Sequence, residues 1–189
     1  QSVRDKWSNG KPYFIYVGAI HQRKNIERML EAYDQFRSQN SKLHQFILVG
    51  NKKWWTSSMQ AALDKMKFKD EVVFTGRVSD EDLNSLMGAA LANLYVSTFE
   101  GFGVPIIESF QAKVPVITSN ITSMPEVAAD SAILVNPTVS SEISEAMLQL
   151  SADQNLRATL INKGVERASY FTWERSSELL WSSIEKALD

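Results

Sequence analysis

The segment that decides the fold is Ser97-Thr98-Phe99-Glu100-Gly101-Phe102-Gly103-Val104-Pro105-Ile106-Ile107-Glu108, which places two carboxylates around a glycine-containing turn with seven residues between them. It directly follows a short apolar run, 93–96, of the kind that forms a buried strand. The glycines allow the backbone to approach a ligand closely, and Pro105 suits the first position of a helix. We therefore expect Glu100 in a loop and Glu108 in the first turn of the helix that follows.

The backbone amides of Phe102, Gly103 and Val104 would then face the same crevice as the two glutamates. The positive end of the helix dipole lies beside them, and phosphate or sugar oxygens are favoured there. A structural interpretation is also open, in which Glu108 only complements the dipole and Glu100 is solvated. The combination of strand, turn, proline and second glutamate favours a ligand site.

Composition excludes several classes of protein. The chain has 189 residues, of which 44% are hydrophobic and 22% charged, as in ordinary globular proteins. Its net charge of −2 gives no basic footprint for nucleic acid, and the absence of cysteine excludes disulfides and thiolate metal sites. His21 and His44 are isolated, so no metal cluster is expected. No apolar run reaches the length of a membrane span, and the first residues of the sequence do not have a signal-peptide pattern.

Short apolar runs alternate with amphipathic stretches along the chain, a pattern typical of an α/β protein with a doubly wound, Rossmann-like parallel sheet. We expect strands at 13–17, 45–49, 71–75, 92–96, 114–118 and 132–135. Helices are expected at 25–39, 56–67, 80–89, 105–112, 140–151, 153–169 and 172–188. Such sheets bind ligands at the carboxyl ends of their strands, and the candidate motifs lie in those loops.

The ends of the chain suggest its domain organisation. Residues 1–12 have the composition of a polar connector, and the first residue is glutamine, so we expect 1–12 to be a linker from an N-terminal domain that is missing from this fragment. Residues 13–189 would form one domain with its C-terminal helices. Phe171 and Trp173 are expected to pack in the core or between domains.

Two cations precede the first long helix. Arg23 and Lys24 stand directly before Asn25, a good N-cap residue, and are therefore placed at the positive end of a helix dipole. Cations are disfavoured there by roughly 0.3–1 kcal/mol each, which indicates a partner anion. The alternative is that both side chains are solvated and point away. Further along, Ser79 and Ser123 are expected to cap the helices that follow them.

The chain resembles the C-terminal, donor-binding domain of the retaining, nucleotide-sugar-dependent glycosyltransferases of family 4, also called glycosyl transferases group 1. The resemblance covers nearly the whole chain and rests mainly on the Glu100–Glu108 motif. Weaker support comes from the segments 18–25, 74–79, 124–127 and 171–173. It implies one half of a two-domain GT-B enzyme.

The resemblance also implies roles for individual residues. It gives Glu100, Arg23 and Lys24 the catalytic roles, with Glu100 on the transferred sugar and the two cations on the donor diphosphate. The implied donor-binding residues are Gly18, Arg77, Val78, Asp80, Phe102, Gly103, Val104 and Glu108. In this set Glu108 holds the ribose, the loop at 77–80 reads the base largely through its backbone, and the amides of 102–104 lie beside the sugar and phosphates. Ala19 departs from the family pattern, in which an arginine often follows the glycine.

No metal or other cofactor is expected, because the chain has no Asp-x-Asp signature and basic residues would stabilise the leaving diphosphate. Retaining glycosidases also use paired carboxylates, but as acid and nucleophile about 5 Å apart across the scissile bond. We interpret Glu100 and Glu108 instead as donor-binding groups.

The resemblance therefore predicts a hexosyltransferase, with mannose from GDP-mannose as the specific hypothesis and a cell-surface glycan or lipopolysaccharide as acceptor. The missing N-terminal domain would hold the glycan or lipid-linked acceptor, and the fragment alone should be inactive. We expect a cytoplasmic location, with the inner face of the cytoplasmic membrane as an alternative and peripheral membrane association of the full protein left open. A non-catalytic nucleotide-sugar-binding or protein-interaction module is the alternative function. A Rossmann oxidoreductase is disfavoured because Gly18 stands alone, without the glycine fingerprint.

Overall fold

Six short apolar segments form one parallel sheet in the computed structural model, which describes residues 2–188. The strands are β1 (Tyr13–Val17), β2 (Gln45–Val49), β3 (Val72–Gly76), β4 (Ala92–Tyr95), β5 (Val116–Ser119) and β6 (Ile133–Val135). Their order in the sheet is β3-β2-β1-β4-β5-β6, and every pair of neighbours is parallel. Successive strands are added toward one edge of the sheet from β1 to β3 and toward the opposite edge from β4 to β6. The order therefore switches between the neighbouring strands β1 and β4, and open α/β sheets bind ligands at such a switch point.

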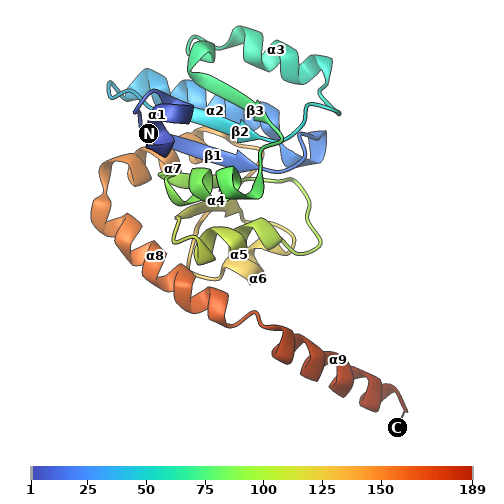
Figure 1. Cartoon of the computed structure of the whole chain (residues 1–189). Helices are drawn as coiled ribbons and strands as arrows, with labels where there is room; N and C mark the ends of the chain where they lie inside the picture. Colours follow the sequence, from blue (N-terminus) through green and yellow to red (C-terminus); the bar gives the residue numbers. More distant parts are fainter. Residues whose placement is uncertain (1, 189) are drawn as a thin grey trace.

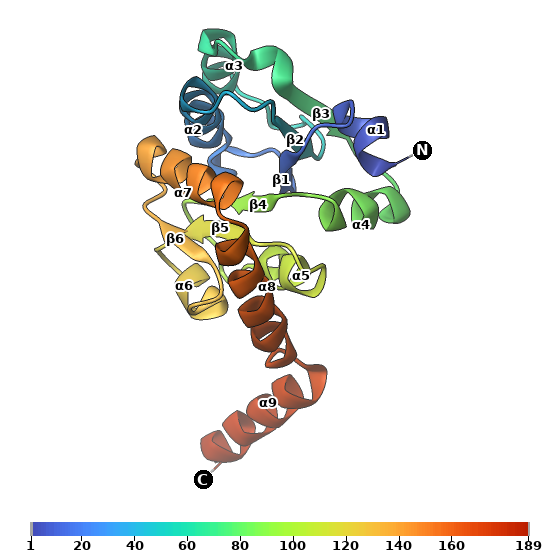
Figure 2. The ribbon, with the colours of Figure 1, turned by 90° about the vertical axis from the view of Figure 1, so that its left-hand side faces the viewer.

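Helices cover both faces of this sheet (Figures 1 and 2). The helices within residues 2–188 are α1 (Val3–Ser8), α2 (Ile26–Gln39), α3 (Ser57–Lys65), α4 (Asp80–Gly88), α5 (Val104–Gln111), α6 (Met124–Ala128), α7 (Ser140–Ala152), α8 (Gln154–Ser169) and α9 (Trp173–Leu188), with short 3-10 turns η1 (Gln22–Lys24) and η2 (Lys69–Glu71). All but α9 pack in the body of the domain. The predicted parallel α/β architecture is confirmed. Each predicted strand and helix lies within two residues of its observed bounds.

The alternation of side chains along β1 explains the two layers. Phe14 and Tyr16 face a core built with α2, α3 and α7, whereas Tyr13 and Ile15 face a core built with α1 and α4. All four side chains are fully buried, as expected for the central strand of a sheet covered on both faces. A third cluster joins α5, α6 and the end of α8 to β4 and β5. Packing on both faces therefore holds β1 in place, and this determines where the loop at its carboxyl end begins.

The N-terminal segment contains a helix that the sequence analysis did not predict. Ser2 and Asp5 form a reciprocal capping box at the start of α1, and Val3 and Trp7 pack against the core beside α4. Lys6 adds an ion pair of 2.6 Å with Asp82 on α4. Residues 3–8 are thus part of the folded domain. The connection of 1–12 to a further domain remains a prediction.

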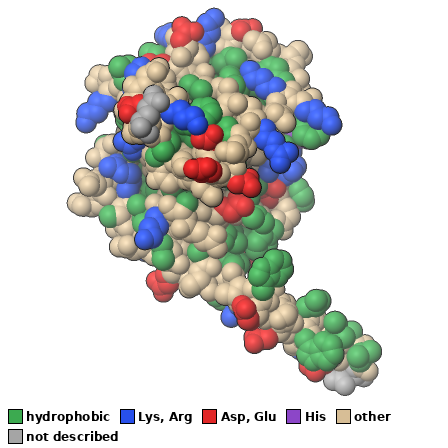
Figure 3. Space-filling view, viewed as in Figure 1, with side chains coloured by type: hydrophobic (Ala, Val, Ile, Leu, Met, Phe, Trp, Pro, Cys, Tyr) green, Lys and Arg blue, Asp and Glu red, His purple; other side chains and the backbone are tan. Residues whose placement is uncertain are grey.

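The last helix, α9, extends away from the rest of the chain (Figure 1), and none of its described residues is buried. Its apolar side chains gather on the surface of this extension (Figure 3). Trp173 is 88% exposed, so the expected core packing of this residue is not found. Phe171 does pack, edge-on at 5.7 Å from Phe102. Within residues 2–188, no helix combines the length and the apolar character needed to cross a bilayer.

Candidate functional site

The turn after β4 is built by a glycine in a left-handed conformation. Gly103 has φ +113° and serves as the N-cap of α5, which therefore begins at Val104 with Pro105 as its second residue. Glu108 consequently lies in the second helical turn, which corrects the prediction of the first turn. A carboxylate there has little interaction with the helix dipole, which acts mainly on the first turn. Glu108 is exposed, and it lines a cavity.

A serine from the neighbouring loop holds the same turn from the other side. The hydroxyl of Ser123 lies 2.9 Å from the carbonyl oxygen of Glu100 and 2.8 Å from that of Phe102. Ser123 makes no capping hydrogen bond to α6, so the predicted capping role is wrong. Its position between β5 and α6 instead fixes the backbone that carries Glu100.

Glu100 pairs with both predicted cations. One carboxylate oxygen lies 2.6 Å from the ammonium of Lys24, and the other lies 2.6 Å from the guanidinium of Arg23. Only 10% of the side-chain surface of Lys24 and of Glu100 is exposed, against 43% for Arg23. The solvated alternatives for Glu100 and Lys24 are therefore wrong. The partner anion that the dipole argument required is Glu100 itself.

The environment of this cluster keeps Glu100 ionised. Partial burial is the largest single effect and opposes its charge, but the hydrogen bonds to the carboxylate, led by that from Lys24, and the charge of Lys24 together outweigh burial and hold the pKa of Glu100 below its usual range. Lys24 also donates a hydrogen bond of 2.9 Å to the hydroxyl of Tyr95, which lies at the end of β4. Burial, followed by the charge of Glu100, raises the pKa of Tyr95, so this phenol stays neutral. Tyr95 is a member of the cluster that the sequence analysis missed, because its hydroxyl is hidden in an apolar strand pattern.

Asn25 occupies the predicted N-cap position of α2, but its side chain does not cap the helix. It has φ +61°, in the left-handed region, and its side chain makes no capping hydrogen bond to α2. Its amide instead donates to the carbonyl oxygens of Val96 (3.0 Å) and Pro137 (2.7 Å). The difference from the prediction has a physical cause, because the two carbonyl oxygens from distant loops hold the side chain of Asn25 away from the backbone amides of α2. Asn25 thereby joins the loops after β1, β4 and β6.

The loops after β1 and β2 approach each other closely at two glycines. The amide of Gly18 donates to the carbonyl oxygen of Val49 at 3.0 Å. A Cβ atom on Gly50 would lie only 2.0 Å from the carbonyl oxygen of Gly18, and Gly50 has φ +149°. Only glycine fits this contact without a backbone shift. Gly50 therefore supports the loop that carries Gly18, Arg23 and Lys24.

Two adjoining cavities lie along the carboxyl ends of the strands. The first, of about 470 Å³, is formed by α4 and α5 and is lined by Glu108. The second, of about 380 Å³, is lined by Gly18 together with Arg77, Val78 and Asp80. Both cavities share Val17 and Leu83 in their walls, so they form one cleft, which we call the strand-end cleft. Ser79 caps α4 by accepting from the amide of Asp82, as predicted, and thereby places Asp80 at the helix start.

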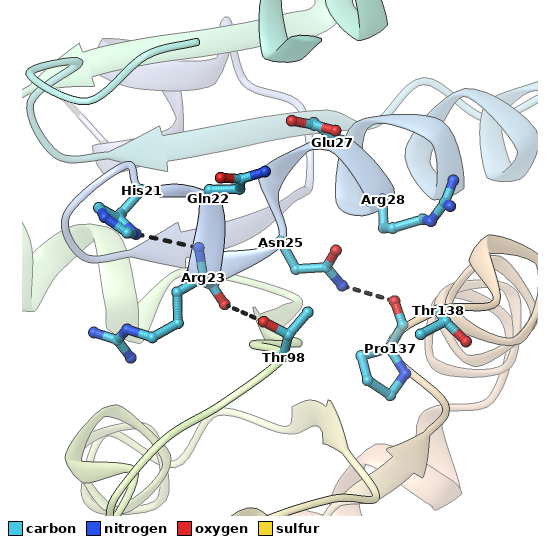
Figure 4. Close-up of a pocket in the computed structure, with 9 residues that line it drawn as sticks. All are labelled: His21, Gln22, Arg23, Asn25, Glu27, Arg28, Thr98, Pro137 and Thr138. Carbon is cyan, nitrogen blue, oxygen red and sulfur yellow. Dashed lines mark hydrogen bonds between the residues drawn. The ribbon is translucent and has the colours of Figure 1, made fainter.

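A third cavity, of about 590 Å³, lies on the α2 side of the η1 turn (Figure 4). Asn25, Thr98 and Thr138 are among its lining residues. Of the predicted site residues, only Arg23 belongs to it, and in Figure 4 the Arg23 side chain points away from Pro137. The predicted site is therefore centred on the strand-end cleft and the Glu100 cluster.

The structure thus gathers the predicted site residues into two neighbouring groups. Arg23, Lys24 and Glu100 form the ion cluster, at the turn that also contains 102–104. Gly18, Arg77, Val78, Asp80 and Glu108 line the strand-end cleft. Phe102 and Val104 are half-exposed, whereas Gly103 is buried. The roles of these residues toward a ligand remain predictions.

The aromatic residue Trp54, in the loop after β2, also lines the cleft and was missed by the sequence analysis. The signal available for it was a pair of adjacent tryptophans in the loop that follows a strand. Among residues 2–188, no group of three or more His, Cys, Asp or Glu side chains is placed to hold a metal ion. Arg23 and Lys24 supply the positive charge needed to neutralise a phosphate group.

A family model described as "Glycosyl transferases group 1" matches residues 2–167. The chain is 34% identical over 162 residues to the O-antigen chain mannosyltransferase B of Escherichia coli. That match covers 86% of this chain and 42% of the relative, so the chain spans less than half of the relative's length.

Two solved structures have the same fold. The C-terminal domain of a glycosyl transferase group 1 family protein, LpcC, from Francisella tularensis aligns with a TM-score of 0.74 at 20% identity, over 90% of this chain and 92% of that chain. HepE of Anabaena, solved in complex with UDP-glucose, aligns with a TM-score of 0.82 at 18% identity, over 97% of this chain and 51% of that chain. These alignments confirm the predicted Rossmann-like architecture of GT-B glycosyltransferases.

Proposed function

We propose, from the premise that this chain belongs to the glycosyl transferases group 1 family, that it is the C-terminal, donor-binding half of a retaining family 4 glycosyltransferase. The proposed reaction is transfer of mannose from GDP-mannose to a growing lipopolysaccharide O-antigen or a related cell-surface glycan. The acceptor, glycan or lipid-linked, would be held by a further domain on the cytoplasmic side of the membrane. The mannosyltransferase of Escherichia coli supports the choice of sugar and acceptor, and the LpcC domain supports the C-terminal position.

The observation that carries this proposal is the set of groups gathered in and beside the strand-end cleft. Arg77, Asp80 and Gly18 line one of its two cavities, Glu108 lines the adjoining one, and the loop that begins at Gly18 carries Arg23 and Lys24. A nucleoside diphosphate sugar presents a base, a ribose, two phosphates and a sugar. A carboxylate accepts two ribose hydroxyl donors, and the cations neutralise the diphosphate.

Asp80 is the group in this cleft that distinguishes bases. The Watson–Crick edge of guanine offers two adjacent donors, N1–H and the N2 amino group, which one carboxylate can accept together. Uracil presents a single donor, N3–H, between two carbonyl acceptors. An exposed carboxylate at the start of α4 therefore favours a guanine nucleotide, in agreement with GDP-mannose.

In the proposed reaction Arg23 and Lys24 stabilise the negative charge that develops on the leaving diphosphate. Electrostatic stabilisation of charge in the transition state is usually the largest contribution to the rate enhancement. Glu100 orients the sugar through its hydroxyl groups. The acceptor attacks on the face from which the diphosphate leaves, and a phosphate oxygen takes up its proton. No metal is required, because the two cations neutralise the diphosphate.

The first test is a calorimetric titration of the chain with GDP, UDP and ADP and with their sugars, in magnesium and in chelator. We expect GDP-linked ligands to bind best and the affinity to be unchanged by chelation. A loss of more than about tenfold on chelation, roughly 1.4 kcal/mol, contradicts metal independence. If no nucleoside diphosphate binds, the proposal fails.

The second test uses the full-length protein with GDP-mannose and an O-antigen acceptor. Nuclear magnetic resonance of the product reports the anomeric configuration. We expect transfer with retention by the full-length protein and none by residues 1–189 alone. An inverted product rules out the retaining mechanism, and transfer by the fragment alone contradicts its assignment as half of the enzyme.

A further inference from the structure

Trp54 is a large aromatic side chain that the donor assignments above leave without a role. It lies in the loop between β2 and α3 and lines the same 380 Å³ cavity as Arg77 and Asp80. Its exposed fraction is 49%, which is high for a tryptophan in the wall of a cavity. The next residue, Trp55, packs edge-on against Phe74 at 5.3 Å and belongs to the border of the core. Trp55 therefore packs at the border of the core, whereas Trp54 keeps about half of its surface exposed.

The neighbours of Trp54 position it without burying it. The His21 ring, from the loop after β1, meets the indole at 5.8 Å between centroids and at an angle of 68°. The ammonium of Lys53 lies 5.4 Å from the indole centroid. An edge-on aromatic contact and a cation near the ring both restrain an indole through its quadrupole, and neither requires burial of the whole ring. The loops after β1 and β2 thus hold a partly exposed aromatic surface at the cleft.

We propose that Trp54 stacks on the nucleobase of the bound nucleotide and forms the aromatic wall of the base pocket. This inference rests on the proposed function, because it assumes that a nucleotide occupies the strand-end cleft. Arg77, Val78 and Asp80 contact the polar edge of a base through hydrogen bonds, but they offer no flat apolar surface for its face. Stacking on an aromatic side chain supplies that surface and tolerates every base, since each base has a π-face.

The test compares ligands that share the ribose and both phosphates but differ in the base. GDP, UDP and ribose 5-diphosphate, which has no base, are titrated calorimetrically into the chain and into its Trp54→Ala and Trp54→Phe variants. We expect Trp54→Ala to weaken GDP by about tenfold, in the range of base–aromatic stacking, and UDP by a smaller factor because its ring is smaller. Ribose 5-diphosphate should bind all three proteins alike. Trp54→Phe should recover most of the affinity for GDP.

Trp173→Ala is the matched control, since Trp173 is 88% exposed on the distant α9, and it should change no affinity. Thermal melts of each variant show whether the fold is intact. Equal losses for GDP and ribose 5-diphosphate overturn the proposal, because they place Trp54 against the phosphates or ribose. Unchanged GDP binding by Trp54→Ala also overturns it. If the unmodified chain binds no nucleotide at all, it is the proposed function that fails.

Discussion

The ammonium of Lys24 lies 2.6 Å from a carboxylate oxygen of Glu100, and each side chain keeps only 10% of its surface exposed. The second oxygen of the same carboxylate is taken by Arg23. Both cations proposed to neutralise the donor diphosphate are therefore engaged by a glutamate of the same chain. A diphosphate that binds these cations competes with Glu100 for their charge, and a carboxylate released from them is free to turn toward the hydroxyl groups of the sugar.

Glu100→Gln should strengthen the binding of a bare nucleoside diphosphate, because the amide carries no charge to compete for Arg23 and Lys24. We expect an increase in affinity of about threefold to tenfold, or roughly 0.6–1.4 kcal/mol, by calorimetry with GDP. The resemblance assigned Glu100 to the transferred sugar, and a residue with that role alone would not affect a bare diphosphate, so the ion cluster changes the expected result. Transfer by the full-length enzyme should fall, since the sugar loses its carboxylate contact.

The matched control is Glu31→Gln, which neutralises an exposed ion pair with Arg28 on α2. It should leave the affinity unchanged. Weaker binding of GDP by Glu100→Gln than by the unmodified chain would show that the carboxylate supports the diphosphate site instead of competing with it.

Glu108→Ala should weaken GDP and GDP-mannose to the same extent, because the proposed partner of Glu108 is the ribose common to both. A hydrogen bond to a charged group contributes roughly 1.5–3 kcal/mol, so we expect a loss of at least tenfold. The 2′-deoxy analogue of GDP should bind the unmodified chain more weakly but show a smaller further loss with Glu108→Ala. Additive losses would indicate that Glu108 does not contact the 2′-hydroxyl group of the ribose. The melting temperature should stay constant, since the residue is exposed.

Gly50→Ala should destabilise the fold, because the new Cβ would lie 2.0 Å from the carbonyl oxygen of Gly18. Forced overpacking costs about 1–3 kcal/mol, and the positive φ adds strain. Urea unfolding measures the loss. Gly88→Ala is the control, since its Cβ meets no atom within 4 Å, and it should be neutral or slightly stabilising. Equal stability of the two variants would mean that the contact between the two loops relaxes without cost.

Glu71→Gln should lower the free energy of unfolding near neutral pH and make that free energy less dependent on pH in the acidic range. Glu71 lies 2.5 Å from the nearly buried guanidinium of Arg37 and accepts a hydrogen bond of 2.9 Å from Tyr33. Burial opposes the charge, but the hydrogen bonds from Arg37 and Tyr33 outweigh it and hold the pKa of Glu71 below the usual 4.5. The lowered pKa stabilises the fold above about pH 4.5, and this stabilisation is lost as the pH falls through the folded-state value.

We therefore expect Glu71→Gln to cost about 1–3 kcal/mol at pH 7 and progressively less as the pH is lowered toward 3. Urea unfolding at pH 7, 4 and 3 measures this difference. The comparison variant is Asp130→Asn, which removes an exposed ion pair with Lys163 and should have little effect at any of these pH values. A difference for Glu71→Gln that stays constant with pH would assign the loss to packing and not to charge.

The strands and long helices could be predicted from sequence because each has a local cause. Apolar runs of four or five residues and helical periodicity depend on neighbours within one element, and Gly103 and Pro105 mark the start of α5 by their own backbone preferences. The short helix α1 escaped prediction because six residues contain too little periodicity, although its capping box was present at Ser2 and Asp5.

Only the part of the site that has a local cause could be predicted. Glu100 and Glu108 belong to one local motif, but the pairing of Glu100 with Lys24 joins residues that are 76 positions apart. The left-handed conformation of Asn25 likewise depends on carbonyl oxygens 71 and 112 positions away. No local pattern distinguishes an asparagine that caps a helix from one that links three loops.

The acceptors of Asn25 are main-chain oxygens, so the link between the three loops does not depend on which side chains occupy positions 96 and 137. An aspartate at 25 would remove the donor and break this link, although its side chain has nearly the same shape. The position of the cation-bearing loop is consequently set by the main-chain course of the two loops that receive it, whereas the charge around its cations is set by one side chain, Glu100.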